Sequence, residues 1–356
     1  MAIDPVEGGR AGELLIDLGA LVANWHDLCE RHQSGPVAGV VKADGYGLGA
    51  AAVAKALASA SCWNFFVAQL SEGIALRRAL SQGPMIAVLG GFPPGADGGA
   101  GLTPVINTPQ DLAAHRAAGT RGAILHIDTG MERLGLDARE LGEAGDLSAL
   151  GLRHVMTHLA CADEPDHPLN AVQARRFNEM AAMLPGVPRS FANSSGLFLG
   201  EAFESDLARP GAALYGLNPT PGHPNPMRCV LRLSVPVLQI RQVRAGATVG
   251  YGATWMAKRD SRIATIAAGY ADGYLRALSG RGLAVAAGRT VQLVGRVSMD
   301  LITLDVTDVP DLAVGDRVEL IGPEQTPDAV AALAGTIGYE VLTALGARYA
   351  RRYITA

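Results

Sequence analysis

The chain has 356 residues, of which 49% are hydrophobic and 18% charged, and its formal net charge at pH 7 is −4. This composition is typical of a folded globular protein with room for one large and one smaller domain, and it gives no basic field for nucleic acid. The first residues lack a signal-peptide pattern and no apolar stretch reaches membrane-spanning length, so we expect a cytoplasmic protein without a membrane partner.

The first part of the chain predicts eight repeats of a short apolar strand, a turn and a helical segment. The strands are expected at 36–42, 65–70, 85–89, 103–106, 123–128, 153–158, 189–193 and 207–214. One of the intervening helices opens with Thr108 as a cap, followed by Pro109. Eight such units in succession predict an α/β fold, a (β/α)8 barrel of the TIM type, with a doubly wound open sheet as the alternative.

A proline-rich segment at 219–226 marks a change of character. After it the chain is expected to be mostly strands, with two short helices near 327–333 and 339–346. The strands are predicted at 230–243, 262–267, 283–286, 291–297, 302–306 and 317–320. The sequence therefore predicts a barrel domain at 1–228 and a β-rich domain at 229–356.

Charged and polar residues stand at the ends of the predicted barrel strands, where barrels of this type build their active sites. Lys42 ends the first strand in the stretch VVKADGYGLG, and His158 ends the sixth. Arg133 follows the fifth strand, and Arg209 lies in the eighth. His154 and His158 could be read as a metal pair, but a strand spreads them along one face without a third ligand, so no metal is expected.

The turns after the seventh and eighth strands are suited to a phosphate. Ser194 offers a hydroxyl, and the small residues Gly211 and Ala212 let a phosphate approach the backbone closely. The chain has neither a Walker lysine nor an acidic metal cluster, which favours an organic phosphate cofactor over a nucleotide with Mg²⁺. Lys42 at the opposite lip then suggests a Schiff base, the way pyridoxal phosphate is carried. A snorkelling or ion-paired Lys42 is the structural alternative.

Motifs along nearly the whole chain resemble those of the alanine racemase family. In order, they are VVKADGYGLG (40–49), HIDTGMERLG (126–135), MTHLACADEPDHP (156–168), ANSSG (192–196), RPGAALYG (209–216), GYGATW (250–255), AAGYADGYLR (267–276), GRVSMD (295–300) and TIGYEVLTALGARYARRY (336–353). The resemblance implies an isomerase that uses pyridoxal 5'-phosphate, with a barrel and a C-terminal β domain. It also implies a homodimer in which each active site takes residues from both chains.

The resemblance implies four catalytic residues. Lys42 should hold the cofactor and act as one base, and Tyr251 of the partner subunit as the other, because racemisation needs a proton removed from one face of Cα and returned to the opposite face. Arg209 should face the pyridine nitrogen and leave it unprotonated, since arginine does not readily lose a proton. His158 should bond the catalytic tyrosine, link it to Arg209 and depress the tyrosine's pKa from about 10.

The remaining site residues also come from the resemblance. Arg133 should contact the cofactor's phenolic oxygen and the substrate carboxylate, with the backbone N–H of Met299 as a second donor. Tyr270 of the partner subunit should narrow the entrance so that it admits alanine, and Asp300 lies nearby without an assigned role. The phosphate contacts should come from Tyr46, Ser194, Gly211, Ala212 and Tyr339.

The sequence departs from the family at His126, where many members carry a lysine, often carbamylated, that orients the arginine. We expect neutral His126, or an anion bound beside it, to support Arg133, and a space-filling His126 is the alternative.

The function implied is interconversion of L- and D-alanine, supplying D-alanine for peptidoglycan. A broader-specificity or serine racemase is one alternative, disfavoured by the gate tyrosines Tyr270 and Tyr339. A non-enzymatic pyridoxal phosphate carrier is another, disfavoured by the β-rich domain with GYGATW in it.

Overall fold

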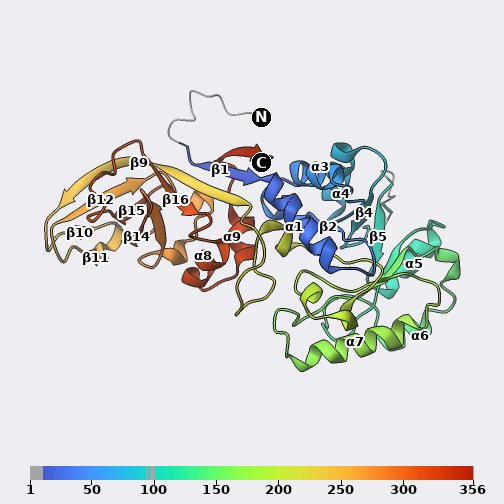
Figure 1. Cartoon of the computed structure of the whole chain (residues 1–356). Coiled ribbons are helices and arrows are strands. Elements are labelled where there is room, and N and C mark those ends of the chain that lie inside the picture. Colours follow the sequence, from blue (N-terminus) through green and yellow to red (C-terminus); the bar gives the residue numbers. More distant parts are fainter. Residues whose placement is uncertain (1–10, 94, 97–100, 356) are drawn as a thin grey trace. The chain divides into compact units, whose positions relative to one another are not determined.

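The computed structural model describes residues 11–93, 95–96 and 101–355, and it divides into two compact units (Figure 1). The barrel unit is Leu21–Arg228, and the β unit comprises the residues up to Ala20 together with those from Cys229 onward. No helix in the described ranges is long and apolar enough to cross a membrane.

Within the described residues, seven parallel strands form the sheet of the barrel unit, and they pair in chain order. They are β2 (Gly39–Val40), β3 (Asn64–Val67), β4 (Met85–Val88), β5 (Thr103–Ile106), β6 (Ile124–His126), β7 (His154–Met156) and β8 (Arg189–Ser190). Their apolar side chains are almost wholly buried, as in Phe66, Ile124 and Val155, each 0% exposed. Parallel strands covered on both faces read as continuous apolar runs, which is why the sequence pattern indicated them.

The segment Leu207–Arg209 takes the eighth place in the barrel. Isolated parallel bridges join Leu207 to Ser190 of β8 and Ala208 to Val37, just before β2. The same short segment therefore bonds to both ends of the seven-stranded sheet and closes it into a ring, as the predicted TIM-type barrel requires.

The eighth strand is shorter than the predicted 207–214. Pro210 follows Arg209 directly and has no N–H to give to a ladder, so its last pairing is the bond that its carbonyl accepts from the N–H of Val40 at 3.1 Å. The chain continues as the 3-10 helix η4 (Ala212–Tyr215), in which the N–H of Leu214 donates to the carbonyl of Gly211 at 2.9 Å.

Helices connect the barrel strands. They are α1 (Leu18–Arg31), which begins in the last residues of the β unit, α3 (Ala50–Ser59), α4 (Leu70–Leu80), α5 (Pro109–Ala117), α6 (Ala138–Glu143) and α7 (Pro168–Ala181). The short element α2 (Lys42–Tyr46) is a turn with left-handed φ and ψ angles. Capping boxes open α4, α5 and α6, and the predicted Thr108 cap accepts a bond from the N–H of Asp111 at 3.0 Å. A cap of this kind satisfies N–H groups that the first helical turn leaves unpaired.

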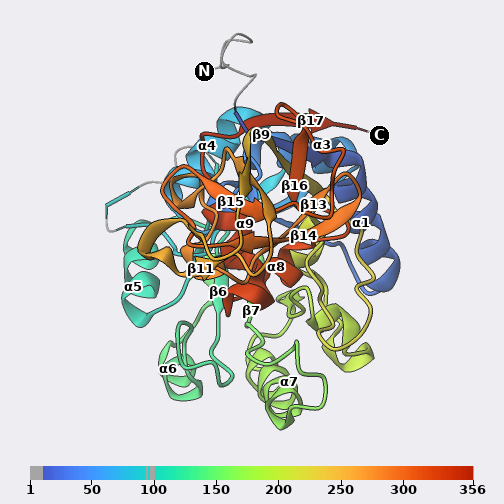
Figure 2. The ribbon, with the colours of Figure 1, turned by 90° about the vertical axis from the view of Figure 1, so that its left-hand side faces the viewer.

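The β unit contains an eight-stranded sheet with the order β12-β15-β14-β13-β16-β9-β1-β17, and an additional β9–β12 pairing closes six of these strands into a ring (Figure 2). The strands are β1 (Glu13–Asp17), β9 (Leu231–Val243), β12 (Ser261–Ile266), β13 (Leu283–Ala286), β14 (Arg289–Val294), β15 (Ile302–Asp305), β16 (Arg317–Ile321) and β17 (Ala350–Ile354). A hairpin of β10 (Thr248–Val249) and β11 (Trp255–Met256) and the helices α8 (Pro327–Ala334) and α9 (Gly338–Ala344) complete the unit.

The strand β1 belongs to this second sheet. It pairs antiparallel with β9 and parallel with β17. The sequence placed residues 1–228 in the barrel domain, whereas the described residues 11–20 belong to the β unit. Neither β1 nor β17 was predicted.

Candidate active site

Lys42 follows β2 at the C-terminal end of the barrel strands and opens an unusual turn. Ala43, Asp44, Gly45 and Tyr46 all have a positive φ, of 53°, 53°, 63° and 53°. For residues other than glycine this region costs about 1 kcal/mol or more each, so the turn needs support from its surroundings. The backbone thus changes direction directly after β2, at Lys42.

The environment of Lys42 lowers the pKa of its amine. The side chain is half-buried. Burial lowers the pKa of Lys42, the nearby Arg133 guanidinium lowers it further, and the Glu72 carboxylate opposes both. A lysine with a depressed pKa is a better nucleophile at neutral pH, as the formation of a Schiff base requires.

Four of the residues predicted to bind phosphate lie together in the barrel unit. Ser194 is buried, and its Oγ accepts hydrogen bonds from the N–H groups of Gly211 at 3.0 Å and Ala213 at 3.2 Å. Since Oγ is the acceptor in both, its own hydroxyl proton is left to donate elsewhere. Ala212 begins η4, where the first N–H groups have no acceptor within the helix.

Tyr46 packs against the same group of residues. Its ring stacks on Tyr215 with 4.5 Å between centroids. A Cβ placed on Gly211 would lie 2.2 Å from the hydroxyl oxygen of Tyr46, so only glycine allows this approach. Tyr46, Ser194, Gly211 and Ala212 thus lie close together, and they are called the predicted phosphate cluster below.

Arg209 is a buried cation whose described side-chain hydrogen bonds go to neutral acceptors. Its Nη1 donates to Ser190 Oγ at 2.6 Å, and Nη2 donates to the Thr157 carbonyl. Burial lowers the pKa of Arg209 to about 10, so it stays charged at neutral pH. These bonds occupy two of the five guanidinium donors, and neither goes to His158, to which the sequence predicted a link.

Two histidines beside Arg209 are neutral at physiological pH. Burial first, and then the charge of Arg209, lower the pKa of His158 to about 3 and that of His126 to about 4. His126 Nδ1 lies 2.8 Å from Asn107 Oδ1. Because the Asn107 amide nitrogen already donates to the carbonyls of Leu89 and Val105, Asn107 Oδ1 is the acceptor and His126 carries its proton on Nδ1. Nε2 of His126 is therefore an acceptor.

Arg133 lies in a loop that the carboxylate of Asp128 organises. Asp128 accepts bonds from the N–H groups of Gly130 at 2.8 Å, Met131 at 2.9 Å and Glu132 at 2.8 Å. This Asx-type turn holds the backbone while the Arg133 side chain stays exposed.

Gln173 on α7 is a buried residue that the sequence interpretation missed. Its Nε2 donates to Thr129 Oγ1 at 3.1 Å and to the His158 carbonyl at 2.9 Å, and its Oε1 accepts from the N–H of Ala160 at 2.9 Å. The amide joins the loops that leave β6 and β7, which carry Arg133 and His158. Nothing in the helical pattern distinguishes this glutamine from an exposed one.

The other predicted site residues lie in the β unit, and their side chains are exposed. The exposed fractions are 72% for Tyr251, 42% for Tyr270, 54% for Met299 and 43% for Tyr339. The N–H of Tyr270 donates to the Ser298 carbonyl, and the loops of Tyr270 and Met299 are therefore neighbours.

Asp300 has a defined partner within the β unit. Arg348 Nη1 lies 2.8 Å from its carboxylate, while Arg348 Nε lies 3.1 Å from that of Asp272. The arginine thereby ties the loop that follows Tyr270 to the loop that contains Met299.

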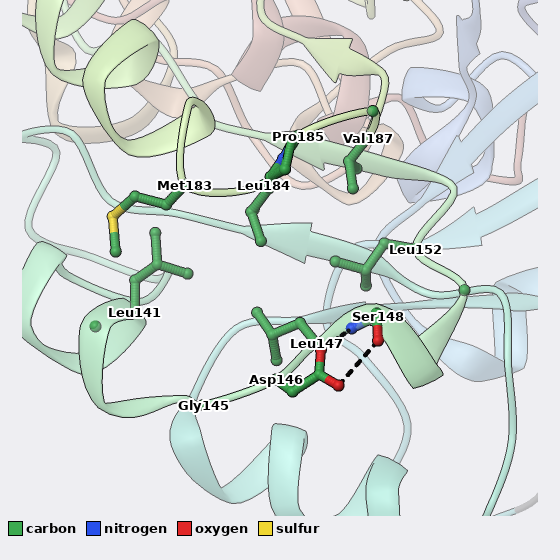
Figure 3. A pocket seen from close by; sticks show the side chains of 13 residues that line it. Leu141, Gly145, Asp146, Leu147, Ser148, Leu152, Met183, Leu184, Pro185 and Val187 are labelled. Carbon is green, nitrogen blue, oxygen red and sulfur yellow. Dashed lines mark hydrogen bonds between the residues drawn. The ribbon is translucent and has the colours of Figure 1, made fainter.

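A separate pocket of about 660 Å³ lies elsewhere in the barrel unit (Figure 3). Leu141, Leu147, Met183 and Leu184 point into it, and its segments precede β7 and β8 in the chain. It is therefore at the N-terminal ends of the strands, opposite the end that carries Lys42 and Arg209, and it has no part in the candidate site.

Two family models match the chain. The model "Alanine racemase, N-terminal domain" covers residues 16–219, and "Alanine racemase, C-terminal domain" covers residues 230–353. The chain belongs to the alanine racemase family. It is accordingly an amino-acid racemase, an isomerase, as the motifs implied.

Named alanine racemases are similar over almost their whole length. The alanine racemase of Acidiphilium cryptum is 56% identical, with 95% of this chain and 97% of that protein covered. A protein named "Alanine racemase, catabolic" from Mesorhizobium japonicum is 50% identical, with 98% and 95% covered. Among solved structures, the alanine racemase of Bartonella henselae with covalently bound pyridoxal phosphate gives a TM-score of 0.92 at 40% identity, with 97% and 99% covered. The expected cofactor of the family, pyridoxal phosphate, is thus confirmed.

Proposed function

We propose that this chain interconverts L- and D-alanine with pyridoxal 5'-phosphate held covalently by Lys42. The observation that carries the proposal is the half-buried Lys42 with its depressed pKa, placed at the strand ends of an alanine racemase barrel. The surrounding groups fit a phosphorylated, anionic cofactor. Arg133 and Arg209 supply positive charge, and the predicted phosphate cluster supplies the hydroxyl proton of Ser194 and the N–H of Ala212 at the start of η4.

The residues divide the work of racemisation. When bound, the pyridoxal ring delocalises the charge that develops at Cα as its proton leaves. Lys42 moves the proton on one face, and Tyr251 of the partner subunit moves it on the other. Arg133 holds the substrate carboxylate together with the N–H of Met299. Arg209, still charged at neutral pH, keeps the ring nitrogen unprotonated, which limits side reactions.

A homodimer is part of this proposal. Large apolar or aromatic side chains of the β unit are exposed, among them Tyr251, Tyr270, Met299 and Ile337. The side chain of Tyr251 is 72% exposed. Such exposure fits a residue that enters the active site of a partner subunit better than a residue that packs within its own subunit.

The physiological role we propose is supply of D-alanine for peptidoglycan in the cytoplasm. Breakdown of alanine is the second candidate, because relatives at 50% and 47% identity are named catabolic. Deletion of the gene separates the two roles. A requirement for added D-alanine supports the first, and loss of growth on alanine as carbon source, without that requirement, supports the second.

The reaction is tested with purified wild type, Lys42→Ala and Tyr251→Phe, and with Lys55→Ala as an exposed-lysine control. We expect an absorbance band near 420 nm that is lost only in Lys42→Ala, and loss of optical rotation from L-alanine that Tyr251→Phe slows by about 10²–10⁴-fold. Mixing Lys42→Ala with Tyr251→Phe should restore up to about a quarter of the wild-type rate, because half of the exchanged dimers contain one complete site. If the wild type binds the cofactor but racemises no amino acid, the protein is a non-enzymatic pyridoxal phosphate carrier. If it turns over serine faster than alanine, it is a serine racemase or a racemase of broader specificity.

A further inference from the structure

Glu72, the third residue of α4, reaches from the start of that helix to the turn that carries Lys42. Its Oε2 accepts hydrogen bonds from the N–H groups of Ala68 at 2.8 Å and Gln69 at 3.0 Å. Its Oε1 accepts from the N–H of Ala43 at 2.7 Å. One carboxylate therefore joins the end of β3, the start of α4 and the residue next to Lys42.

Capping of α4 accounts for only one of these two oxygens. The capping box uses Oε2, which bonds the N–H of Gln69. Glu140 occupies the same position in the capping box of α6, and the one backbone bond described for its carboxylate comes from Asp137, at 3.1 Å. The bond from Glu72 to Ala43 is therefore additional to what a capping glutamate needs.

The bond to Ala43 falls where the backbone most needs support. Ala43 is the first of five consecutive residues with positive φ, which end at Gly47. A hydrogen bond to an ionised carboxylate is about twice as strong as a neutral one. It thus helps to offset the cost of the left-handed turn that sets the direction of the Lys42 side chain.

Glu72 also acts on the charge of Lys42. Of the groups around the lysine, Arg133 lowers its pKa and Glu72 raises it. His158, also within reach of Lys42, is neutral because burial and Arg209 lower its pKa to about 3. The balance between burial and Arg133 on one side and Glu72 on the other decides how much of the amine is protonated.

We propose that Glu72 is a positioning residue for Lys42, which fixes the left-handed turn and supplies the negative charge beside the amine. The proposal deepens the proposed function, on which it rests only for the identity of the molecule that Lys42 binds.

The composition of the chain makes a direct test possible. It contains three lysines, Lys42, Lys55 and Lys258, and the last two are exposed. The full chain, freed of bound cofactor, is acetylated in trace amounts over a pH series, and each lysine is quantified by peptide mass spectrometry. Lys55 and Lys258 serve as internal references. We expect the midpoint for Lys42 to fall in Glu72→Gln and to stay at the wild-type pH in Glu140→Gln, which removes a matched capping carboxylate.

The second measurement is the affinity of the same proteins for added pyridoxal phosphate. We expect Glu72→Gln and Glu72→Asp to bind it about tenfold more weakly. Glu72→Gln loses the charge that strengthens the bond to Ala43, and the side chain in Glu72→Asp is too short to reach the N–H of Ala43. Glu72→Asp keeps the charge and serves as the decisive variant if Glu72→Gln does not fold. Wild-type midpoint and affinity in folded Glu72 variants would overturn the proposal and leave Glu72 a helix cap. A wild type that does not bind pyridoxal phosphate at Lys42 would overturn the proposed function instead, while the acetylation midpoints would still decide the role of Glu72.

Discussion

His126 illustrates how a single neighbour determines what a residue can do. Asn107 fixes the proton on Nδ1, and burial keeps the ring neutral, with a pKa of about 4. A neutral imidazole does not attract an anion, but its Nε2 lone pair can accept a bond from a guanidinium. The neutral ring therefore argues against an anion held beside His126, and direct support of Arg133 by His126 stays a prediction.

Replacement of His126 tests this role. We expect His126→Ala to raise KM for alanine about tenfold with a smaller change in kcat, because Arg133 would lose an acceptor that orients it toward the substrate carboxylate. Steady-state racemisation in both directions provides the measurement. His115→Ala removes a buried histidine of α5 and serves as the control. Equal KM values in the two variants and the wild type would refute the role.

At this scale the sequence identified residues whose chemistry is visible in a motif, such as Lys42 and Ser194. It missed Glu72, Asn107 and Gln173, because their roles depend on which distant backbone groups they meet. The Q-x-x-E pattern at 69–72 could have indicated a capping box, but not the bond to Ala43.

Among the elements, α7 has a role beyond covering the barrel. Gln173 is 0% exposed, and its amide satisfies buried groups on the loops after β6 and β7. Removing one partner from such a network leaves the others unpaired away from water, which costs more than the bond itself was worth.

We expect Gln173→Leu to lower the free energy of unfolding by about 2–4 kcal/mol, because the buried amide loses its three hydrogen bonds. It should also weaken catalysis, since the loops it joins carry Arg133 and His158. Urea titrations measure the first effect and racemisation the second. Gln110→Leu, an exposed helical glutamine on α5, is the matched control. If both variants unfold at the same urea concentration, the network does not contribute to stability.

The strands that the sequence predicted best are those with a local signal. The buried parallel strands are recognisable in the sequence as apolar runs, and the start of α5 is recognisable from its Thr-Pro pair. β1 alternates between buried and half-buried residues, but its partners β9 and β17 lie far along the chain, so no local pattern reveals its sheet. β17, ARRYI, has no fully buried residue to mark it. The end of the eighth strand was misjudged because an apolar run continues past Pro210.

For the whole molecule, the buried neutral histidines imply sensitivity to acid. His126 has a pKa of about 4 in the folded chain, against about 6.5 when unfolded. Between these pH values the unfolded state binds more protons, so stability is complete above pH 6.5 and decreases as the pH falls toward 4. The full contribution of His126 is on the order of 3 kcal/mol.

Urea unfolding at pH 7.5 and at pH 5 tests this expectation. The wild type should be less stable at the lower pH, and His126→Asn should show a smaller loss between the two. His223→Asn removes an exposed histidine and should behave as the wild type does. A pH dependence unaltered by His126→Asn would mean that this histidine is not the source.

The position of β1 between β9 and β17 also bears on how the chain folds while it is being made. A ribosome synthesises β1 early, yet both strands that pair with it follow the entire barrel unit in the sequence. The barrel strands pair in chain order, and only the closure of the ring by residues 207–209 waits for the end of that unit. Leu14 and Ile16, each 0% exposed in the finished sheet, therefore stay uncovered throughout that interval. We therefore expect β1 to be open to chaperones in the nascent chain until β17 has emerged.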